Sequence, residues 1–402
     1  MERAIAMFLL VALLPVVHST PTFGHSSAFP LRGVHGGAVP VRAAEGAALH
    51  RRQESATSWC FKWAQQSAIV NGTLYLYGGE LKTEASQTSD TWNNDFITLD
   101  LTETWQIGSP LLKALPRPSG PPEVARGYLW YSSDALFLYG GQFSWKPSVD
   151  PTAFSTWRYD IASGDWHESS DPQTQGGQNA DTDGEPVERV SEGAGVTIPQ
   201  LGRGYYFGGH QDGYTTLGWS QDVWRIYLKS MLEFTFPGEP NEQVDGLGGG
   251  DVTGPDGVYR NITDGGLQSE AGFTERADGL LVYVPGFGEK GILLALAGGT
   301  SETFTQMNPV NVFDIATSEW YTQTTSGETS EARVNPCAVV AAAPDGSSTN
   351  VYMWGGKDLL PFEDQKHRSD MWILTVPAFR WIQVDQGGQS VPGERSDHTC
   401  DI

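Results

Sequence analysis

Short runs of apolar residues, each closed by a pair of glycines, recur along most of the chain. The runs have the length and β-rich composition of buried strands, and a double glycine after a strand indicates a tight turn. Five copies occur, and their consecutive spacings are 62, 68, 90 and 57 residues. The glycine pairs are Gly78-Gly79, Gly140-Gly141, Gly208-Gly209, Gly298-Gly299 and Gly355-Gly356.

Two further registers follow the same spacing. A large aromatic residue comes 21 to 26 residues after the second glycine of each pair, at Trp105, Trp166, Phe234, Trp320 and Trp381. An arginine shortly after an acidic residue marks the start of most units, at Arg126, Arg189, Arg276, Arg333 and Arg395. Three registers with matching gaps indicate a repeat of roughly 50 to 70 residues, which is typical of an array or a propeller.

Each unit is predicted to form one twisted, four-stranded blade. In the first unit, Asn71-Gly72 separates two β-rich runs, and this dipeptide is typical of a two-residue hairpin turn. We expect the five aromatics to pack between neighbouring blades, because a lone blade cannot bury both of its faces. Residues 171–185 and 238–266, rich in Gly, Asp, Asn and Gln, are predicted to be long exposed loops between blades.

The double-glycine strands with a downstream tryptophan resemble the repeats of the kelch family over roughly residues 58 to 402, although Phe234 replaces tryptophan in the third unit. The resemblance implies an all-β fold, a kelch-type β-propeller. Five blades are recognisable, and residues 395–400 look like the first strand of a sixth, as in a truncated six- or seven-bladed ring.

The N-terminal region has the pattern of a secretory leader rather than of a folded domain. An apolar run of 14 residues follows Arg3 and is too short for a comfortable membrane span, so residues 1–19 are predicted to be a signal peptide. Residues 20–52 are predicted to be a disordered pro-segment that ends at the dibasic pair Arg51-Arg52. The alternatives are a signal anchor and an incidental arginine pair. Residues 53–402 then form the propeller, and the dibasic pro-segment makes the chain look most like secreted or surface kelch proteins of filamentous fungi.

Composition narrows the class of partner. Lys and Arg total 25 and Asp and Glu total 48, so the net charge of −23 argues against binding nucleic acid or anionic membranes. Three cysteines leave one unpaired or indicate missing partners, and the pairing of Cys60, Cys337 and Cys400 stays open. The sequons at Asn71 and Asn261 are predicted glycosylation sites in a secreted glycoprotein.

The loops that follow the glycine pairs are predicted to share one face with the arginine register. A candidate binding face therefore combines the five arginines with Trp145, Trp219 and Tyr214. The alternative is that each arginine pairs with acids or loop carbonyls and joins neighbouring blades, since an ion pair repeated in every unit usually serves the repeat.

Enzymatic constellations are not apparent. Beyond the pro-segment only His167, His210, His367 and His398 occur, and they are scattered without metal-ligand spacing. We therefore expect no catalytic, cofactor or metal site. The predicted function is a secreted, extracellular scaffold at the cell surface or wall that binds an unidentified protein or carbohydrate, without a transmembrane segment in this chain. The alternatives are a secreted oxidase similar to galactose oxidase, and the ectodomain of a membrane-anchored kelch protein.

Overall fold

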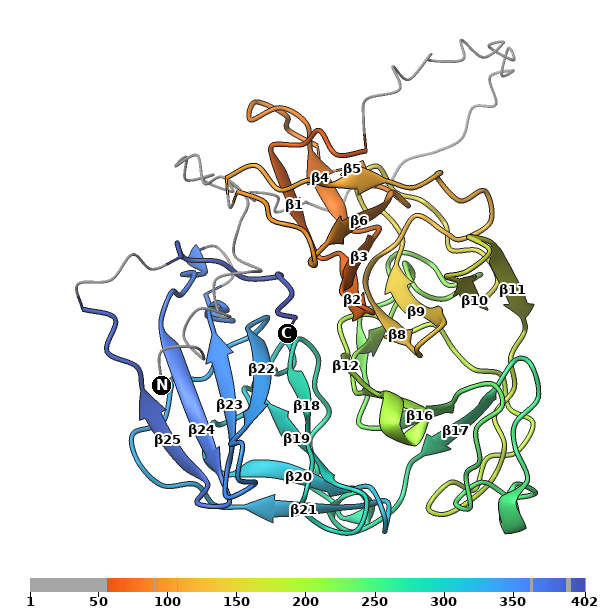
Figure 1. Ribbon diagram of the computed structural model, residues 1–402, viewed down its shortest axis with the longest axis vertical. Coiled ribbons are helices and arrows are strands. Elements are labelled where there is room, and N and C mark those ends of the chain that lie inside the picture. The colour runs from red at the N-terminus through yellow and green to blue at the C-terminus, as the bar shows by residue number, and fades with distance from the viewer. Residues whose placement is uncertain (1–55, 90, 107, 362–363, 388–391, 402) are drawn as a thin grey trace, which may run out of the picture.

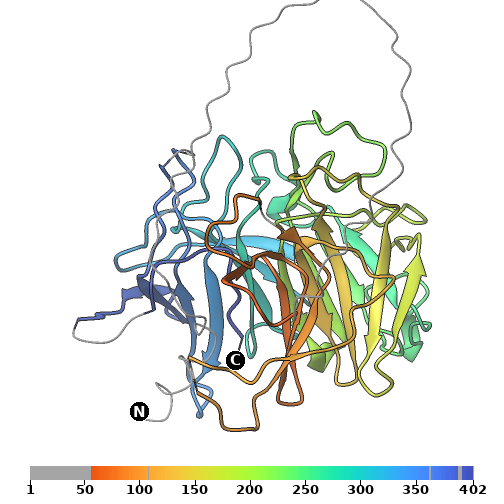
Figure 2. The ribbon, with the colours of Figure 1, turned by 90° about the horizontal axis from the view of Figure 1, so that it is seen from above.

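The chain forms a ring of antiparallel sheets. The computed structural model describes residues 56–89, 91–106, 108–361, 364–387 and 392–401. The predicted leader, the pro-segment and the pair Arg51-Arg52 lie outside these residues. Figure 1 shows the sheets following one another in chain order around a centre, from the orange β2 to the blue β25. Figure 2 shows the ring from the side, with strands side by side and loops leaving at both ends.

Five of the sheets have four strands, and each is one blade. Blade 1 consists of β2 (Gln66–Val70), β3 (Thr73–Tyr77), β6 (Phe96–Asp100) and β7 (Lys113–Ala114). Blade 2 consists of β8 (Ala125–Tyr131), β9 (Ala135–Gln142), β10 (Ser155–Asp160) and β11 (Trp166–Ser170). Blade 3 consists of β12 (Ala194–Ile198), β13 (Arg203–Phe207), β16 (Met231–Thr235) and β17 (Val258–Ile262). Blade 4 consists of β18 (Leu280–Val284), β19 (Ile292–Leu296), β20 (Val310–Asp314) and β21 (Glu319–Gln323). Blade 5 consists of β22 (Cys337–Ala342), β23 (Thr349–Trp354), β24 (Met371–Val376) and β25 (Arg380–Gln383).

Smaller elements decorate the loops between the second and third strands of blades 1 and 3. A three-stranded sheet joins β1 (Phe61–Trp63), β4 (Glu80–Lys82) and β5 (Thr91–Trp92). A two-stranded sheet joins β14 (His210–Gln211) and β15 (Ile226–Tyr227). The helical segments among the described residues are single 3-10 turns, η2 (Pro199–Leu201), η3 (Gly248–Gly250) and η4 (Leu267–Ser269).

A closed ring of backbone hydrogen bonds links six units around the centre. Each member donates its N–H to the carbonyl of the corresponding residue in the unit before it, over N···O distances of 2.7 to 3.3 Å, and Ala64 closes the ring by donating to Asp397. All six members have positive φ, between 52° and 63°. The members are Ala64, Arg126, Glu192, Asp278, Asn335 and Asp397.

The sixth member shows that the C-terminal residues occupy the place of a sixth unit. Asp397 both donates to Asn335 of blade 5 and accepts from Ala64, which precedes blade 1. The structure assigns no strand to residues 392–401, so the predicted sixth strand is an extended segment beside β22 and β2 (Figure 1). The prediction of five blades plus the inner part of a sixth is confirmed at the level of fold.

The double glycines turn the chain toward the next unit. At four of the five pairs both residues have positive φ, and the second glycine donates its N–H to a carbonyl at the entrance of the following unit. In blade 4 the corresponding pair is Ala297-Gly298, because Gly298 makes that bond and Gly299 does not have positive φ. The turn in blade 4 therefore begins one residue earlier than the predicted pair Gly298-Gly299.

Four of the five predicted aromatics pack between blades, Phe234 against Trp130 and Phe137 of blade 2, but only three of the five mark a fourth strand. Trp166, Trp320 and Trp381 stand on fourth strands, paired with Tyr159, Phe313 and Leu374 of the third strands. Phe234 is instead on the third strand of blade 3, and Tyr259 is its partner on the fourth strand. Trp105 lies in the loop before β7, outside any strand. In blade 3, residues inserted between β16 and β17 move the fourth strand beyond the expected spacing.

Aromatic packing joins successive blades. Trp166 packs at steep angles against Tyr77 and Phe96 of blade 1, with ring centroids 5.6 and 5.3 Å away. Trp320, which is fully buried, lies 4.6 Å from the ring of Phe207 in blade 3. Burying these aromatic side chains between blades stabilises the propeller, because it covers faces that a single blade leaves exposed to water.

The two segments predicted to be exposed loops are exposed at about half of their positions, and contacts with each other and with the blades fix the rest. The second contains β17, so it interrupts blade 3 rather than separating blades. The two segments pair with each other, since Gln178 donates its N–H to Gln243 and Asp245 to Gly176. They therefore form a brace on blade 3 that also reaches blade 4.

Candidate functional site

The central channel is lined by the first strand of every blade and by the C-terminal residues. Its cavity measures 390 Å³ and is bordered by six segments. They are Gln65–Ile69, Gly127–Tyr131, Gly193–Thr197, Gly279–Tyr283, Pro336–Val340 and His398–Asp401. The ring of six hydrogen-bonded residues lies at the entrance of these strands, on the face where the loops after the second strands leave the blades.

Charged side chains of that ring and its neighbours form the channel mouth. Arg126 lies 3.1 Å from Glu80 and 3.2 Å from Glu192. Lys357 contacts Asp397 at 3.1 Å, and Asn335 donates to Asp278 at 2.6 Å. The positive backbone φ of the ring residues turns these side chains together, although their identities differ from unit to unit.

Burial and charge set the protonation of the mouth. Burial opposes the ionisation of Glu192, but Arg225, His210 and Arg126 hold its pKa well below the ordinary value. Burial also opposes the charge of Asp397, yet Lys357 and Arg126 lower its pKa to about 2. At Asp278 burial and the charge of Glu192 outweigh the opposing influence of Arg225, and they raise its pKa to about 6.

His210 joins this network from the loop sheet of blade 3. Its imidazole is fully buried, with Nδ1 3.2 Å from Glu192 and Nε2 3.2 Å from Asp212. Burial disfavours its cation, but the two carboxylates raise its pKa above the ordinary value. Arg225 contacts Glu192 at 2.8 Å and closes the group. The histidine therefore lies between two carboxylates of the network.

Four of the five candidate arginines join blades or line blade entrances. Arg189 lies over the rings of Phe143 and Phe154 at 5.0 and 5.2 Å. Arg276 lies over Phe207 at 5.4 Å, and Arg395 over Trp354 at 5.2 Å. Arg189, Arg276 and Arg333 are buried, so these three are not part of an exposed binding face.

Arg333 makes the best-formed contact of this group. Its guanidinium pairs with both carboxylate oxygens of Asp370, at 2.7 and 2.9 Å, and donates to the carbonyl of Gly355. Burial lowers the pKa values of Arg189 and Arg276 to about 10. These contacts match the alternative in which the arginines stabilise the repeat. Arg126, at the channel mouth, is displaced by two residues from the register of Arg276, Arg333 and Arg395.

The predicted aromatics lie in loops of blades 2 and 3 that touch each other. Phe143 donates its N–H to Tyr214, and the Gln221 side chain donates to Asp150. Trp145 is exposed, whereas Tyr214 and Trp219 are half-buried. Trp145 also packs edge-on against Trp92 of blade 1, with ring centroids 6.2 Å apart.

The sequence prediction missed several exposed apolar residues on the same two loops. Trp224 is 77% exposed and Leu217 59% exposed, and Val149 and Ile226 are also exposed. We define the aromatic loop surface as the five exposed side chains of these loops, Trp145, Val149, Leu217, Trp224 and Ile226. The signal available in the sequence was the apolar content of residues 217–226, which is unusual for a loop between a double glycine and the next strand.

The remaining predicted positions are placed as follows. Asn71 is exposed in the turn between β2 and β3, and Asn261 is half-buried on β17. Cys337 and Cys400 form a disulfide, and Cys60 is free and exposed. The described part of the chain contains no helix with the length and apolarity that crossing a membrane requires.

Comparison with known proteins identifies a close relative. The chain is 58% identical over 355 residues to the "Kelch repeat-containing protein" of Arthroderma benhamiae, a fungus. The alignment covers 88% of this chain and 53% of that protein, so the chain spans about half the length of its relative. The relative's name states a repeat and no reaction. No family model matches the chain.

Proposed function

We propose that this chain, whose fold is a kelch-type β-propeller, is a non-catalytic scaffold that binds a protein or a glycan outside the cell, at the surface or in the wall. Its relative is named for the same repeat, and kelch repeats form interaction scaffolds. The N-terminal pattern of a signal peptide and the dibasic pair supports export. The observation that carries the proposal is the aromatic loop surface.

This surface has the features of a binding site rather than of ordinary exterior. Five of the large apolar side chains that the structure shows exposed come from two touching loops on one face of the ring. Exposed apolar patches on a folded protein usually mark contact sites, and tryptophan is enriched among residues that dominate binding energy. Rigid blades hold both loops, so the surface is preformed for a partner.

The surroundings of the surface are polar and acidic. Asp150 and Asp222 lie on the same loops, and Lys146 sits over the Trp145 ring at 5.9 Å. An apolar centre with a polar rim is the usual anatomy of a protein contact, and exposed tryptophans with nearby carboxylates equally suit a sugar ring. A protein partner and a glycan partner would therefore contact the same residues of the aromatic loop surface.

The test is binding of the purified chain to cell walls isolated from the organism that makes it. Trp145→Ser combined with Trp224→Ser should weaken binding about thirtyfold or more, because a hot-spot tryptophan contributes about 2 kcal/mol. The matched control is Leu111→Ser, which removes an apolar side chain of the same 59% exposure as Leu217 from the opposite end of blade 1. Equal binding by both variants would refute the assignment of the surface.

The same experiment separates the two partner classes. Walls treated with a protease retain binding if the partner is a glycan, and lose it if the partner is a protein. Walls treated with polysaccharide hydrolases give the converse result. A circular dichroism spectrum unchanged by the double substitution shows that lost binding does not result from unfolding.

A further inference from the structure

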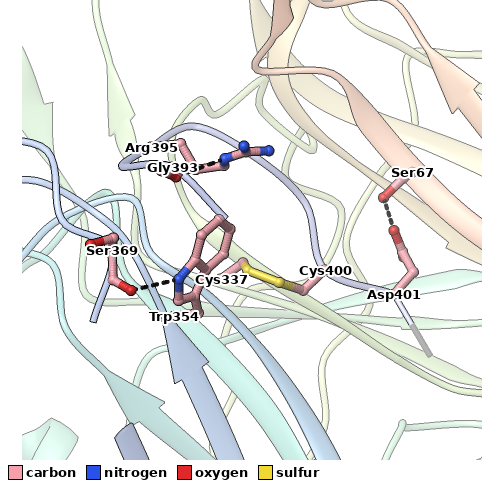
Figure 3. Close-up of a disulfide and its surroundings, with 8 residues drawn as sticks. All are labelled: Ser67, Cys337, Trp354, Ser369, Gly393, Arg395, Cys400 and Asp401. Carbon is pink, nitrogen blue, oxygen red and sulfur yellow. Dashed lines mark hydrogen bonds between the residues drawn. A yellow bond between two sulfur atoms is a disulfide. The ribbon is translucent and has the colours of Figure 1, made fainter. Parts of the chain in front are cut away.

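Cys337, His398 and Cys400 gather on the wall of the central channel, where the sixth unit meets blade 5. Cys337 is the first residue of β22, and the other two belong to the C-terminal segment. Among the residues that the structure describes, this group places two sulfurs and an imidazole nitrogen within 4.8 Å of one another. Figure 3 shows the Cys337–Cys400 disulfide beside Trp354, with Arg395 on the same segment.

His398 lies where its two ring nitrogens are buried and poorly paired. Its ring packs edge-on against Trp354, with centroids 4.8 Å apart, and both ring nitrogens are buried without a well-formed hydrogen bond. Burial and the neighbouring Arg395 lower its pKa to about 4. Buried polar atoms without partners are rare in folded proteins and often mark a site for an ion or water.

The residue types in this group match those that bind zinc in proteins. Two cysteine sulfurs and a neutral imidazole are donors that zinc prefers, and three protein ligands leave a fourth position for water. All three residues border the 390 Å³ channel cavity, which gives an ion a path to the site. The donor set also excludes calcium and magnesium, which take oxygen ligands.

We propose that Cys337, Cys400 and His398 form a redox-controlled zinc site, closed by a disulfide when oxidised and open to Zn²⁺ when reduced. A dithiol reductant transfers two electrons and two protons to the disulfide, which becomes two thiols while the dithiol becomes a disulfide. Zn²⁺ then replaces the two thiol protons, which are released, and the imidazole donates its lone pair. Thiolates, not thiols, are the ligands, so uptake is favoured by rising pH.

Either form of the site fastens the sixth unit to blade 5. The disulfide joins residues separated by 63 positions, and the metal would join the same two β-propeller units through the same sulfurs. The alternation would therefore keep the ring closed in both an oxidising and a reducing environment. This role is independent of the aromatic loop surface, which lies on other blades.

The experiment uses the full chain carrying Cys60→Ser, so that the remaining thiols belong to the site. After anaerobic reduction with a dithiol and removal of the reductant, Co²⁺ is added as a spectroscopic substitute for zinc. We expect one Co²⁺ per chain, with thiolate-to-cobalt charge-transfer absorption and the visible bands of a tetrahedral site. The oxidised chain should take up none, and excess Zn²⁺ should abolish the cobalt spectrum.

Two further measurements keep the result interpretable. His398→Phe preserves the ring against Trp354 but removes both nitrogens, and should weaken Co²⁺ binding at least tenfold while the two-thiolate absorption diminishes. In the wild-type chain, Zn²⁺ should protect Cys337 and Cys400, but not Cys60, from alkylation detected by peptide mass spectrometry. If the reduced, folded chain binds no cobalt and Zn²⁺ gives no such protection, the proposal is wrong. Equal affinity in His398→Phe would remove the histidine from the site.

Discussion

The joint between blades 3 and 4 and the seam around the sixth unit hold neighbouring parts of the ring together by different means. At the joint, Trp320 packs on Phe207 in a dry aromatic cluster, and the brace of blade 3 adds a buried polar network. At the seam, the C-terminal residues 395–401 are attached to blade 5 by the disulfide and to blade 1 by single polar contacts. The joint is broad and repetitive, whereas the seam relies on a few specific bonds.

The polar network at the joint shows why the brace is ordered. Arg260 and Glu233 are both fully buried and pair at 2.9 Å, and Arg260 also donates to Ser318 of blade 4. The amide of Gln243 reaches the carbonyls of Ile315 and Ala316 in the same turn of blade 4. Because Arg260 and Gln243 have partners on two blades, the inserted segments stabilise the joint instead of loosening it.

The C-terminal residues 395–401 contact both blade 5 and blade 1, but each contact involves only a few residues. Asp401 accepts from the Ser67 hydroxyl of β2 at 2.8 Å, and Asp397 bonds to Lys357 of blade 5. Two backbone hydrogen bonds complete the inner ring: Ala64 donates its N–H to Asp397, and Asp397 donates its N–H to Asn335. The comparison indicates that the sixth unit, whose aromatic contacts are limited to Trp354 of blade 5, depends mainly on covalent and polar bonds to stay in place.

The largest effect is expected at the aromatic core of the joint. Trp320→Ala removes a fully buried ring and should lower the free energy of unfolding by about 3–5 kcal/mol. Urea denaturation followed by tryptophan fluorescence and circular dichroism measures the loss. The matched control is Trp105→Ala, which removes a half-buried tryptophan from a loop and should change stability by about 1 kcal/mol or less. Similar losses for both variants would contradict the different placements of the two rings.

Breaking the buried ion pair of the brace should lower the free energy of unfolding almost as much as Trp320→Ala does. Arg260→Leu leaves Glu233 charged and buried without its main partner, and should cost about 3–5 kcal/mol. The double variant Arg260→Leu with Glu233→Gln should recover part of this loss, because the uncompensated charge is gone. Denaturation midpoints of the single and double variants measure the difference. A double variant less stable than Arg260→Leu would show that the charge of Glu233 is not the source of the penalty.

At the seam, the covalent bond is expected to dominate. Cys400→Ser opens the disulfide and should cost about 2–4 kcal/mol, because the crosslink restricts the unfolded chain. Limited proteolysis should then cut residues 392–401 first, before the blades are degraded. Cys60→Ser, which changes an exposed free cysteine, should leave both stability and the proteolytic pattern unchanged. Resistance of the C-terminal segment in the Cys400→Ser chain would mean that the polar contacts alone hold it.

The sequence predicts the joint and the seam to different degrees. Double glycines record a local backbone demand, positive φ beside a neighbouring carbonyl, so they reveal the blades directly. Tyr259 was missed because an insertion inside blade 3 displaced the fourth strand from the regular spacing, and Phe234 happened to stand where an aromatic was expected. A fixed spacing therefore locates strands only in units without insertions.

The residues of the channel mouth, of the cysteine–histidine group and of the aromatic loop surface share no sequence pattern that identifies them. The residues of the inner hydrogen-bonded ring share positive φ but not identity, so nothing in the sequence marks Ala64 and Asp278 as equivalent. Likewise, His398 and Cys400 approach Cys337 only because the ring closes. Trp224 was overlooked since its exposure results from how two loops pack against each other.

The smallest effect concerns Asp278, at the channel mouth between the joint and the seam. Its pKa is raised to about 6 in the folded chain, above the value near 3.9 of an unfolded aspartate. The folded state therefore holds a proton that the unfolded state loses first, so this residue's contribution becomes less favourable as pH rises from about 4 to about 6, and stays so above that range.

Asp278→Asn removes this titration while keeping a side-chain oxygen that accepts from Asn335. The variant should be more stable than the wild-type chain at pH 7.5, by about 1 kcal/mol after allowance for the partial exposure of the carboxyl group. At pH 4 the two chains should have nearly equal denaturation midpoints. A stabilisation of the same size at both pH values would show that the gain does not come from the ionisation of Asp278, and the charge balance of the channel mouth would need another explanation.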